Sequence, residues 1–209
     1  MTVPTATATA IEEHLADIGR RAVASGLVQA TGGNLSARLP DSDKFVVTGK
    51  GTRLDTLVPA DFAVMNLAGE VQAGTNPSSE WRLHQRTYQE RPDVNAIVHV
   101  HPQHAVLLDA LGYPIRFLTL DHAFYVGSAG HVPFFANGSQ ELADVAALQA
   151  REHNAIVLAN HGCSALGPDI EMAYRRAVLL EEAAVMTYRA LTLGDTTTTF
   201  GEGVELIHQ

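Results

Sequence analysis

Two short apolar segments that each lead into a histidine constrain the fold of this chain most strongly. They read NAIVHVHP at residues 95–102 and NAIVLANHG at residues 154–162. A short continuous apolar run that ends at proline or glycine is typical of a buried strand. The sequence therefore predicts two buried strands, with histidines at or near the end of each.

Helical and strand patterns alternate along the rest of the chain. Ile11, Leu15 and Ile18 share one face of a predicted helix at residues 10–26. Further helices are predicted after the PSSE segment up to about residue 90 and at residues 103–111, 139–153 and 169–193, and further strands at residues 44–48 and 62–67. This order predicts an α/β fold in which helices cover a mixed or antiparallel sheet.

The chain is expected to form one domain over residues 1–209. Its length suits a single core, and no linker-like segment divides it. Residues 1–9 are expected to be a disordered start, and residues 194–209 to form a polar tail.

Composition excludes several classes of protein. The net charge is −9 with only two lysines, whereas a nucleic-acid surface would show a basic stripe. No apolar run reaches the roughly 18 residues of a membrane helix, and no secretory signal begins the chain. A single cysteine, Cys163, excludes a disulfide framework and fits a reducing compartment. We therefore expect a cytoplasmic protein that binds neither nucleic acid nor membrane.

Three histidines form a candidate metal site. His99 and His101 are two residues apart in a predicted strand, so both imidazoles point to one face and can chelate one ion. His161 ends the other apolar strand, and a set of three leaves coordination positions open for substrate, as catalytic metals require. Two ordinary hydrogen-bonded histidines and a third at a strand end explain the same residues, and His104 can compete as a ligand.

Three small polar loops are candidate anion sites. They are TGGN at residues 31–34, GKG at residues 49–51 and PSSE at residues 77–80. Glycines let backbone amides approach a ligand, and two serines at a helix start offer hydroxyls and free N–H groups. Plain turns and helix N-capping explain the same segments without any ligand. A chain of this net charge needs some such local device to hold an anionic substrate.

The order of these motifs, completed by PSSEWRLH, VHVHP and NHG, resembles the class II aldolase/adducin family over about residues 11–190. The resemblance implies a three-layer α/β/α fold around a central mixed, largely antiparallel sheet. It also implies a homotetramer with active sites between subunits.

The resemblance assigns roles to individual residues. His99, His101 and His161 match the family's ligands for Zn²⁺, and Glu80 matches the catalytic acid/base. The positions that match the substrate phosphate site are Gly33, Asn34, Lys50, Gly51, Ser78 and Ser79. Another divalent metal in place of zinc is compatible with the same ligands.

The implied activity is reversible cleavage of a ketose 1-phosphate, such as L-fuculose 1-phosphate, to dihydroxyacetone phosphate and an aldehyde. Zinc would stabilise the negative charge that develops on the adjacent oxygens. Glu80 would move protons, a task that favours a pKa raised toward the working pH.

The resemblance also implies tyrosine proton donors, one in a middle loop and one in the tail. After Tyr188 the chain has no tyrosine, and the middle segment reads LDHAFY at residues 120–125. We therefore predict that Tyr125 supplies the proton, with Asp121 and His122 as the other candidates.

Three alternative functions remain open. Methylthioribulose-1-phosphate dehydratases share the zinc ligands and the glutamate, but eliminate water. Pentose-phosphate 4-epimerases carry an aspartate where Glu80 stands. A non-catalytic adducin-like module is expected to have lost the metal ligands, which this chain retains.

Overall fold

The structure is a computed structural model that describes residues 5–201 of the chain. Within these residues a single eight-stranded sheet has the order β4-β3-β2-β1-β5-β8-β7-β6. Its strands are β1 (Asn34–Arg38), β2 (Lys44–Thr48), β3 (Phe62–Asn66), β4 (Val71–Gly74), β5 (Ala96–Val100), β6 (Ala129–Val132), β7 (Ala155–Leu158) and β8 (Gly162–Gly167). Neighbouring strands are antiparallel except for β6 and β7, which are parallel. The sheet is therefore mixed and largely antiparallel, as predicted.

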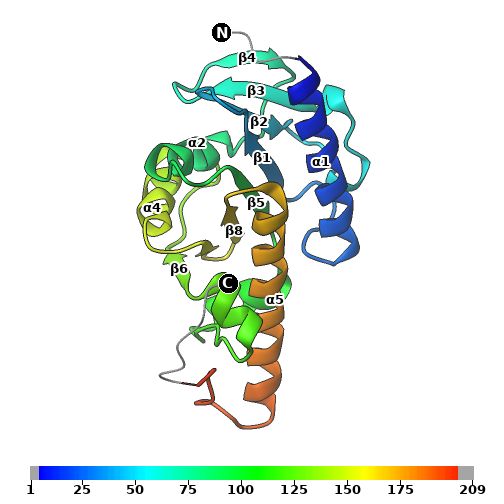
Figure 1. The fold of residues 1–209 in the computed structure, drawn as a ribbon. Coiled ribbons are helices and arrows are strands. Elements are labelled where there is room, and N and C mark those ends of the chain that lie inside the picture. Colours follow the sequence, from blue (N-terminus) through cyan, green and yellow to red (C-terminus); the bar gives the residue numbers. More distant parts are fainter. Residues whose placement is uncertain (1–4, 202–209) are drawn as a thin grey trace.

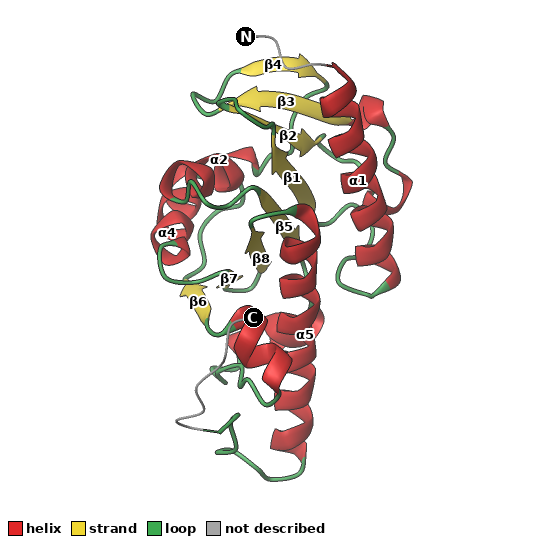
Figure 2. Cartoon of the chain, in the orientation of Figure 1, coloured by secondary structure: helices red, strands yellow, loops and turns green. Residues whose placement is uncertain are grey.

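Helices cover both faces of this sheet (Figure 1, Figure 2). The helices are α1 (Thr5–Ala24), α2 (Trp81–Glu90), α3 (Gln103–Ala110), α4 (Gln140–Ala150) and α5 (Ile170–Thr192), with the short turns η1 (Leu54–Thr56), η2 (Pro59–Asp61) and η3 (His122–Val126). One apolar cluster joins α2 and α4 to the sheet, and two clusters join α1, α3 and α5 to its other face. The three-layer α/β/α fold is confirmed.

The alternation of side chains along β5 sets up the site. Val98 and Val100 pack in the cluster of α1 and α5, and Ile97 packs in the cluster of α2 and α4. Because successive strand residues point to opposite faces, His99 points to the α2 side with Ile97. On that face it lies between Asn34 of β1 and Ser164 of β8, its partners in register.

The sequence did not predict the strands on either side of β5. Residues 31–36 have the composition of a small polar segment, and residues 162–167 match no helix or strand pattern. The five residues NLSAR of β1 and the six residues GCSALG of β8 are small and polar for strands, yet most are buried. They lack the alternation that identifies a half-exposed strand, because both faces of the sheet are covered here.

The start of the chain differs from the expectation, whereas the described part of the tail agrees with it. α1 begins at Thr5, so residues 5–9 are helical and not a disordered start. The alternating alanines of this segment favour helix, and Ala8 packs against the core. Residues 195–201 form no helix or strand, whereas residues 1–4 and 202–209 lie outside the described residues. No helix in the described part is long and apolar enough to cross a membrane.

Candidate metal centre and active site

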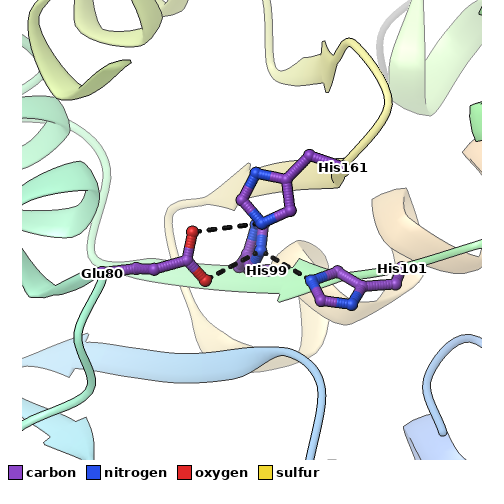
Figure 3. A group of neighbouring side chains, drawn as sticks. All are labelled: Glu80, His99, His101 and His161. Carbon is purple, nitrogen blue, oxygen red and sulfur yellow. Dashed lines mark hydrogen bonds and ion pairs between the residues drawn. The ribbon is translucent and has the colours of Figure 1, made fainter. Parts of the chain in front are cut away.

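Four side chains converge at the end of β5 (Figure 3). Glu80, His99, His101 and His161 each direct one potential ligand atom to the same point, and these atoms all lie within 4.8 Å of one another. The Nε2 atoms of His99 and His101 are 3.2 Å apart. Oε2 of Glu80 lies 3.3 Å from His99 Nε2, and Oε1 lies 3.2 Å from His161 Nε2. The three predicted metal ligands and the predicted acid/base therefore form one cluster.

Local backbone features bring these residues together. His99 lies in β5, and His101 follows the strand, where its backbone N–H donates to Leu27 O. His161 lies in the tight turn between β7 and β8, after Asn160 in the left-handed conformation (φ 56°), which asparagine tolerates. At Gly162 a Cβ would lie 2.5 Å from Val100 O and 2.6 Å from the His101 ring. Only glycine lets this turn approach β5 so closely.

The donor set fits a divalent metal. Tetrahedral ligands at about 2.0–2.1 Å from a zinc ion are about 3.3–3.4 Å apart, close to the 3.2 Å and 3.3 Å separations seen here. Oε1 of Glu80 is buried and has no hydrogen-bond partner among residues 5–201. A bound cation would satisfy this unpartnered carboxylate oxygen, which is buried beside three imidazoles.

Two of the three histidines are held in the neutral form that binds metals. Burial first, and then the neighbouring imidazoles of His99 and His161, lower the pKa of His101 to about 4. Burial and His99 likewise lower the pKa of His161. Ser164 Oγ lies 3.2 Å from Nδ1 of His99 and fixes that ring with Nε2 directed at the cluster.

The pKa of Glu80 is lowered, contrary to the upward shift expected from the sequence. Burial raises the pKa of Glu80, but His99, His161 and the hydrogen bond from Asn34 together outweigh it. The carboxylate is therefore ionised at neutral pH, so it begins as a proton acceptor and not as an acid.

The three candidate anion loops surround this cluster. Asn34 Nδ2 donates to Glu80 Oε2 at 2.9 Å, and the backbone N–H of Ser78 donates to Thr48 O at 2.9 Å. The N–H of Lys50 donates to Asn76 O, so the second loop lies against the third.

The six predicted phosphate residues differ in access. Lys50, Gly51 and Ser79 are exposed, Gly33 is half-buried, and Asn34 and Ser78 are buried. The side chain of Asn34 is already bonded to Glu80 and His84. The three exposed residues therefore form the solvent-facing side of the predicted phosphate site.

Tyr125 is not brought to the cluster within one chain. It lies in η3 and packs among residues of α3 and α5, on the face of the sheet opposite Glu80 and His99. The guanidinium of Arg175 lies 4.8 Å above its ring. A role for Tyr125 at this site would therefore have to be exerted on another copy of the chain. Cys163 is buried on the same face as Tyr125.

The sequence did not predict a role for three buried polar residues beside Glu80. His84 and Tyr88 lie on α2 and Ser36 lies on β1, and hydrogen bonds join them to one another and to Asn34. Spacing was the available signal: residues 80, 84 and 88 share a helix face, and residues 34 and 36 share a strand face.

Known proteins resemble the chain over most of its length. Residues 13–188 match the family described as Class II Aldolase and Adducin N-terminal domain. A 5-deoxy-D-ribulose 1-phosphate aldolase of Bacillus thuringiensis is 32% identical over 88% of this chain and 86% of its own. A 5-methylthioribulose-1-phosphate/5-deoxyribulose-1-phosphate aldolase of Rhodospirillum rubrum is 34% identical over 89% of this chain and 84% of its own.

Solved structures agree with these relatives. An L-fuculose 1-phosphate aldolase superposes with a TM-score of 0.84 at 28% identity, covering 93% of this chain and 92% of its own. The L-fuculose-1-phosphate aldolase from Thermus thermophilus superposes with a TM-score of 0.77 at 29% identity, covering 90% of this chain and 98% of its own.

Proposed function

Since the chain belongs to the class II aldolase and adducin family, we propose that it cleaves a ketose 1-phosphate reversibly to dihydroxyacetone phosphate and an aldehyde. The chain is a metal-dependent aldolase, a carbon–carbon lyase, and its substrate is a small sugar phosphate. The observation that carries the finer proposal is the convergence of three histidines on an ionised, buried Glu80. This set supplies both a cation site and a proton acceptor within one cluster.

The names of the relatives narrow the substrate class. They act on 5-deoxyribulose 1-phosphate, 5-methylthioribulose 1-phosphate or L-fuculose 1-phosphate. Each of these is a ketose that carries phosphate at one end and a methyl or methylthio group at the other. We therefore propose L-fuculose 1-phosphate and 5-deoxyribulose 1-phosphate as the first substrates to test.

In the proposed mechanism His99, His101 and His161 hold the metal, for which zinc suits a set of three imidazoles. When bound, the metal stabilises the negative charge that develops on the substrate oxygens during cleavage. In the cleavage direction, ionised Glu80 accepts the proton of the substrate hydroxyl that becomes the aldehyde oxygen as the carbon–carbon bond breaks. It then returns this proton to the carbon of the dihydroxyacetone phosphate half, so no net proton is lost over the cycle.

The non-reacting end of the substrate is proposed to lie against the three loops. Lys50 offers a cation, Ser78 and Ser79 precede α2, and Gly33 and Gly51 have positive φ values of 73° and 75°. Backbone N–H groups at such positions bind phosphate without an excess of positive charge. Holding the phosphate orients the bond to be cleaved relative to Glu80.

We further propose a cytoplasmic homotetramer with sites shared between subunits. The position of Tyr125 away from Glu80 in one chain supports a shared site, because a tyrosine donor would then come from a neighbouring copy. Light scattering at micromolar concentration tests this, and a monomer would contradict it.

The test of the activity is release of dihydroxyacetone phosphate from the two proposed substrates by zinc-loaded protein. Glu80→Gln, which keeps the size of the side chain, is the control. We expect metal-dependent release that falls at least 100-fold in the variant, about the value of one positioned acid/base. Loss of water from 5-methylthioribulose 1-phosphate without this release would instead establish the dehydratase.

A further inference from the structure

A chain of hydrogen bonds runs from Glu80 into the interior between α2 and β1. Asn34 Nδ2 donates to Glu80 Oε2 at 2.9 Å, and Asn34 Oδ1 is bonded to His84 Nε2. His84 Nδ1 lies 2.6 Å from Ser36 Oγ, which lies 2.7 Å from the hydroxyl of Tyr88. This hydrogen-bond chain thus extends from the carboxylate of Glu80 through four further side chains.

All five side chains are shielded from solvent. Their residues are between 0% and 4% exposed. Bulk water cannot satisfy these polar atoms, and a buried polar group left without its hydrogen bond destabilises the fold. Each member therefore depends on its neighbours in the chain.

Regular secondary structure builds this arrangement. Glu80 immediately precedes α2, and the helix carries His84 and Tyr88 at successive intervals of four residues. Strand β1 carries Asn34 and Ser36, two residues apart. Residues at these spacings lie on one face of a helix and on one face of a strand. Side chains from the helix and the strand consequently alternate along the hydrogen-bond chain.

The donor and the acceptor of each hydrogen bond in this series can be assigned by starting from Glu80. An ionised carboxylate only accepts, so the amide nitrogen of Asn34 faces Glu80 and its carbonyl oxygen faces His84. That carbonyl also only accepts, so Nε2 of His84 carries the proton. Burial lowers the pKa of His84 to about 3 and keeps the ring neutral, so Nδ1 is an acceptor.

The remaining two bonds are then determined. Ser36 donates its only hydroxyl proton to Nδ1 of His84, so it must accept the hydroxyl proton of Tyr88. All four hydrogen bonds are donated in one direction, toward Oε2 of Glu80. Reversing any single bond would leave a buried acceptor without a donor.

We infer that His84 is a positioning residue: through Asn34 it fixes Oε2 of Glu80 and with it the orientation of the carboxylate toward the cluster. This inference rests on the proposed role of Glu80. Oε2 accepts from Asn34 at 2.9 Å, whereas Oε1 faces Nε2 of His161 at 3.2 Å. The bond from Asn34 therefore holds the carboxylate in the plane that directs Oε1 at the cluster.

The first test measures the tautomer of His84 and needs no substrate. Long-range proton–nitrogen NMR of the zinc-loaded protein identifies which imidazole nitrogen carries hydrogen, and His84→Gln assigns the signal by removing it. We expect a neutral ring protonated at Nε2 throughout pH 6–8. A ring protonated at Nδ1, or at both nitrogens, would overturn the inferred direction of the chain.

The second test separates positioning from folding. His84→Leu fills the space without a donor, whereas the amide nitrogen of His84→Gln can occupy the place of Nε2 and restore the bond to Asn34. Thr87→Val is the matched control, because Thr87 is also buried on α2 but its hydroxyl donates to Leu83 O of the same helix and takes no part in the hydrogen-bond chain.

We expect kcat to fall about 10–100-fold in His84→Leu, as when a partner of a site residue is lost, with little change in KM or in bound zinc. His84→Gln should recover most of that loss, and Thr87→Val should retain kcat. Unchanged kcat in His84→Leu, loss of its zinc, or an equal fall in Thr87→Val would each overturn the inference. If the unaltered protein cleaves no ketose 1-phosphate, the proposed function fails, while the NMR result still decides the hydrogen-bond chain.

Discussion

Gly162→Ala tests whether the close approach of the β7–β8 turn to β5 holds the metal site. The added Cβ would lie 2.5 Å from Val100 O and 2.6 Å from the His101 ring, whereas such contacts are essentially never shorter than 3.0 Å. The carbonyl would have to move by at least 0.5 Å and the ring by at least 0.4 Å, the differences between those values. Metal–ligand distances tolerate only about 0.2 Å.

The expected result has two parts. Overpacking should lower the free energy of unfolding of the metal-free protein by about 1–3 kcal/mol, measured by urea denaturation. Displacement of His101 should weaken zinc binding about 10–100-fold, measured by competition with a chelator. Both effects arise from the same contact, so they should appear together.

The control is Gly130→Ala in β6. A Cβ there meets side-chain atoms of Gln149 and His153 at 2.9 Å, and no backbone atom is among its three nearest neighbours. Flexible side chains can move aside, and replacing glycine also restricts the unfolded chain, so the net change in stability should be small. Wild-type stability and zinc affinity in Gly162→Ala would refute the reasoning.

Three further predictions concern the rest of the molecule. Ser164→Ala, which frees Nδ1 of His99, should weaken zinc binding about 10–100-fold in chelator competition while the fold is retained. Removal of the metal by a chelator should abolish cleavage, and zinc should restore it; full activity of the metal-free protein would contradict the proposed metal dependence. Arg21 first, and then His14, lower the pKa of Glu171 from 4.5 to about 2, so its ion pair should stabilise the fold above about pH 4.5 and lose this effect as the pH falls toward 2. Since the pair is half-exposed, Glu171→Gln should cost at most about 1 kcal/mol at pH 7 in urea denaturation, and the difference from wild type should vanish near pH 2.

The strands that carry the histidines could be predicted because their apolar runs are unambiguous. Their neighbours could not: β1 and β8 are buried on both faces and consist largely of small residues, so no period-2 pattern marks them. Recognising β1 as a strand would have paired Asn34 with His99. It would also have placed Asn34 and Ser36 on one face. The candidate ligands were therefore accessible from sequence, whereas the residues that orient them depended on the order of strands in the sheet.

The lowered pKa of Glu80 changes how its part in the reaction has to be understood. A glutamate with a raised pKa would be protonated before the reaction and would act first as an acid. Glu80 is instead kept ionised by His99, His161 and the hydrogen bond from Asn34. Such a carboxylate is a weak base, and its protonated form is correspondingly a strong acid. Taking a proton is therefore the unfavourable half of the cycle, and returning it to carbon is the favourable half. In that situation fixed orientation matters more than basicity, because proton transfer over a short, aligned distance compensates for a weak base. A buried hydrogen-bond chain that holds one carboxylate oxygen still is the structural counterpart of that requirement.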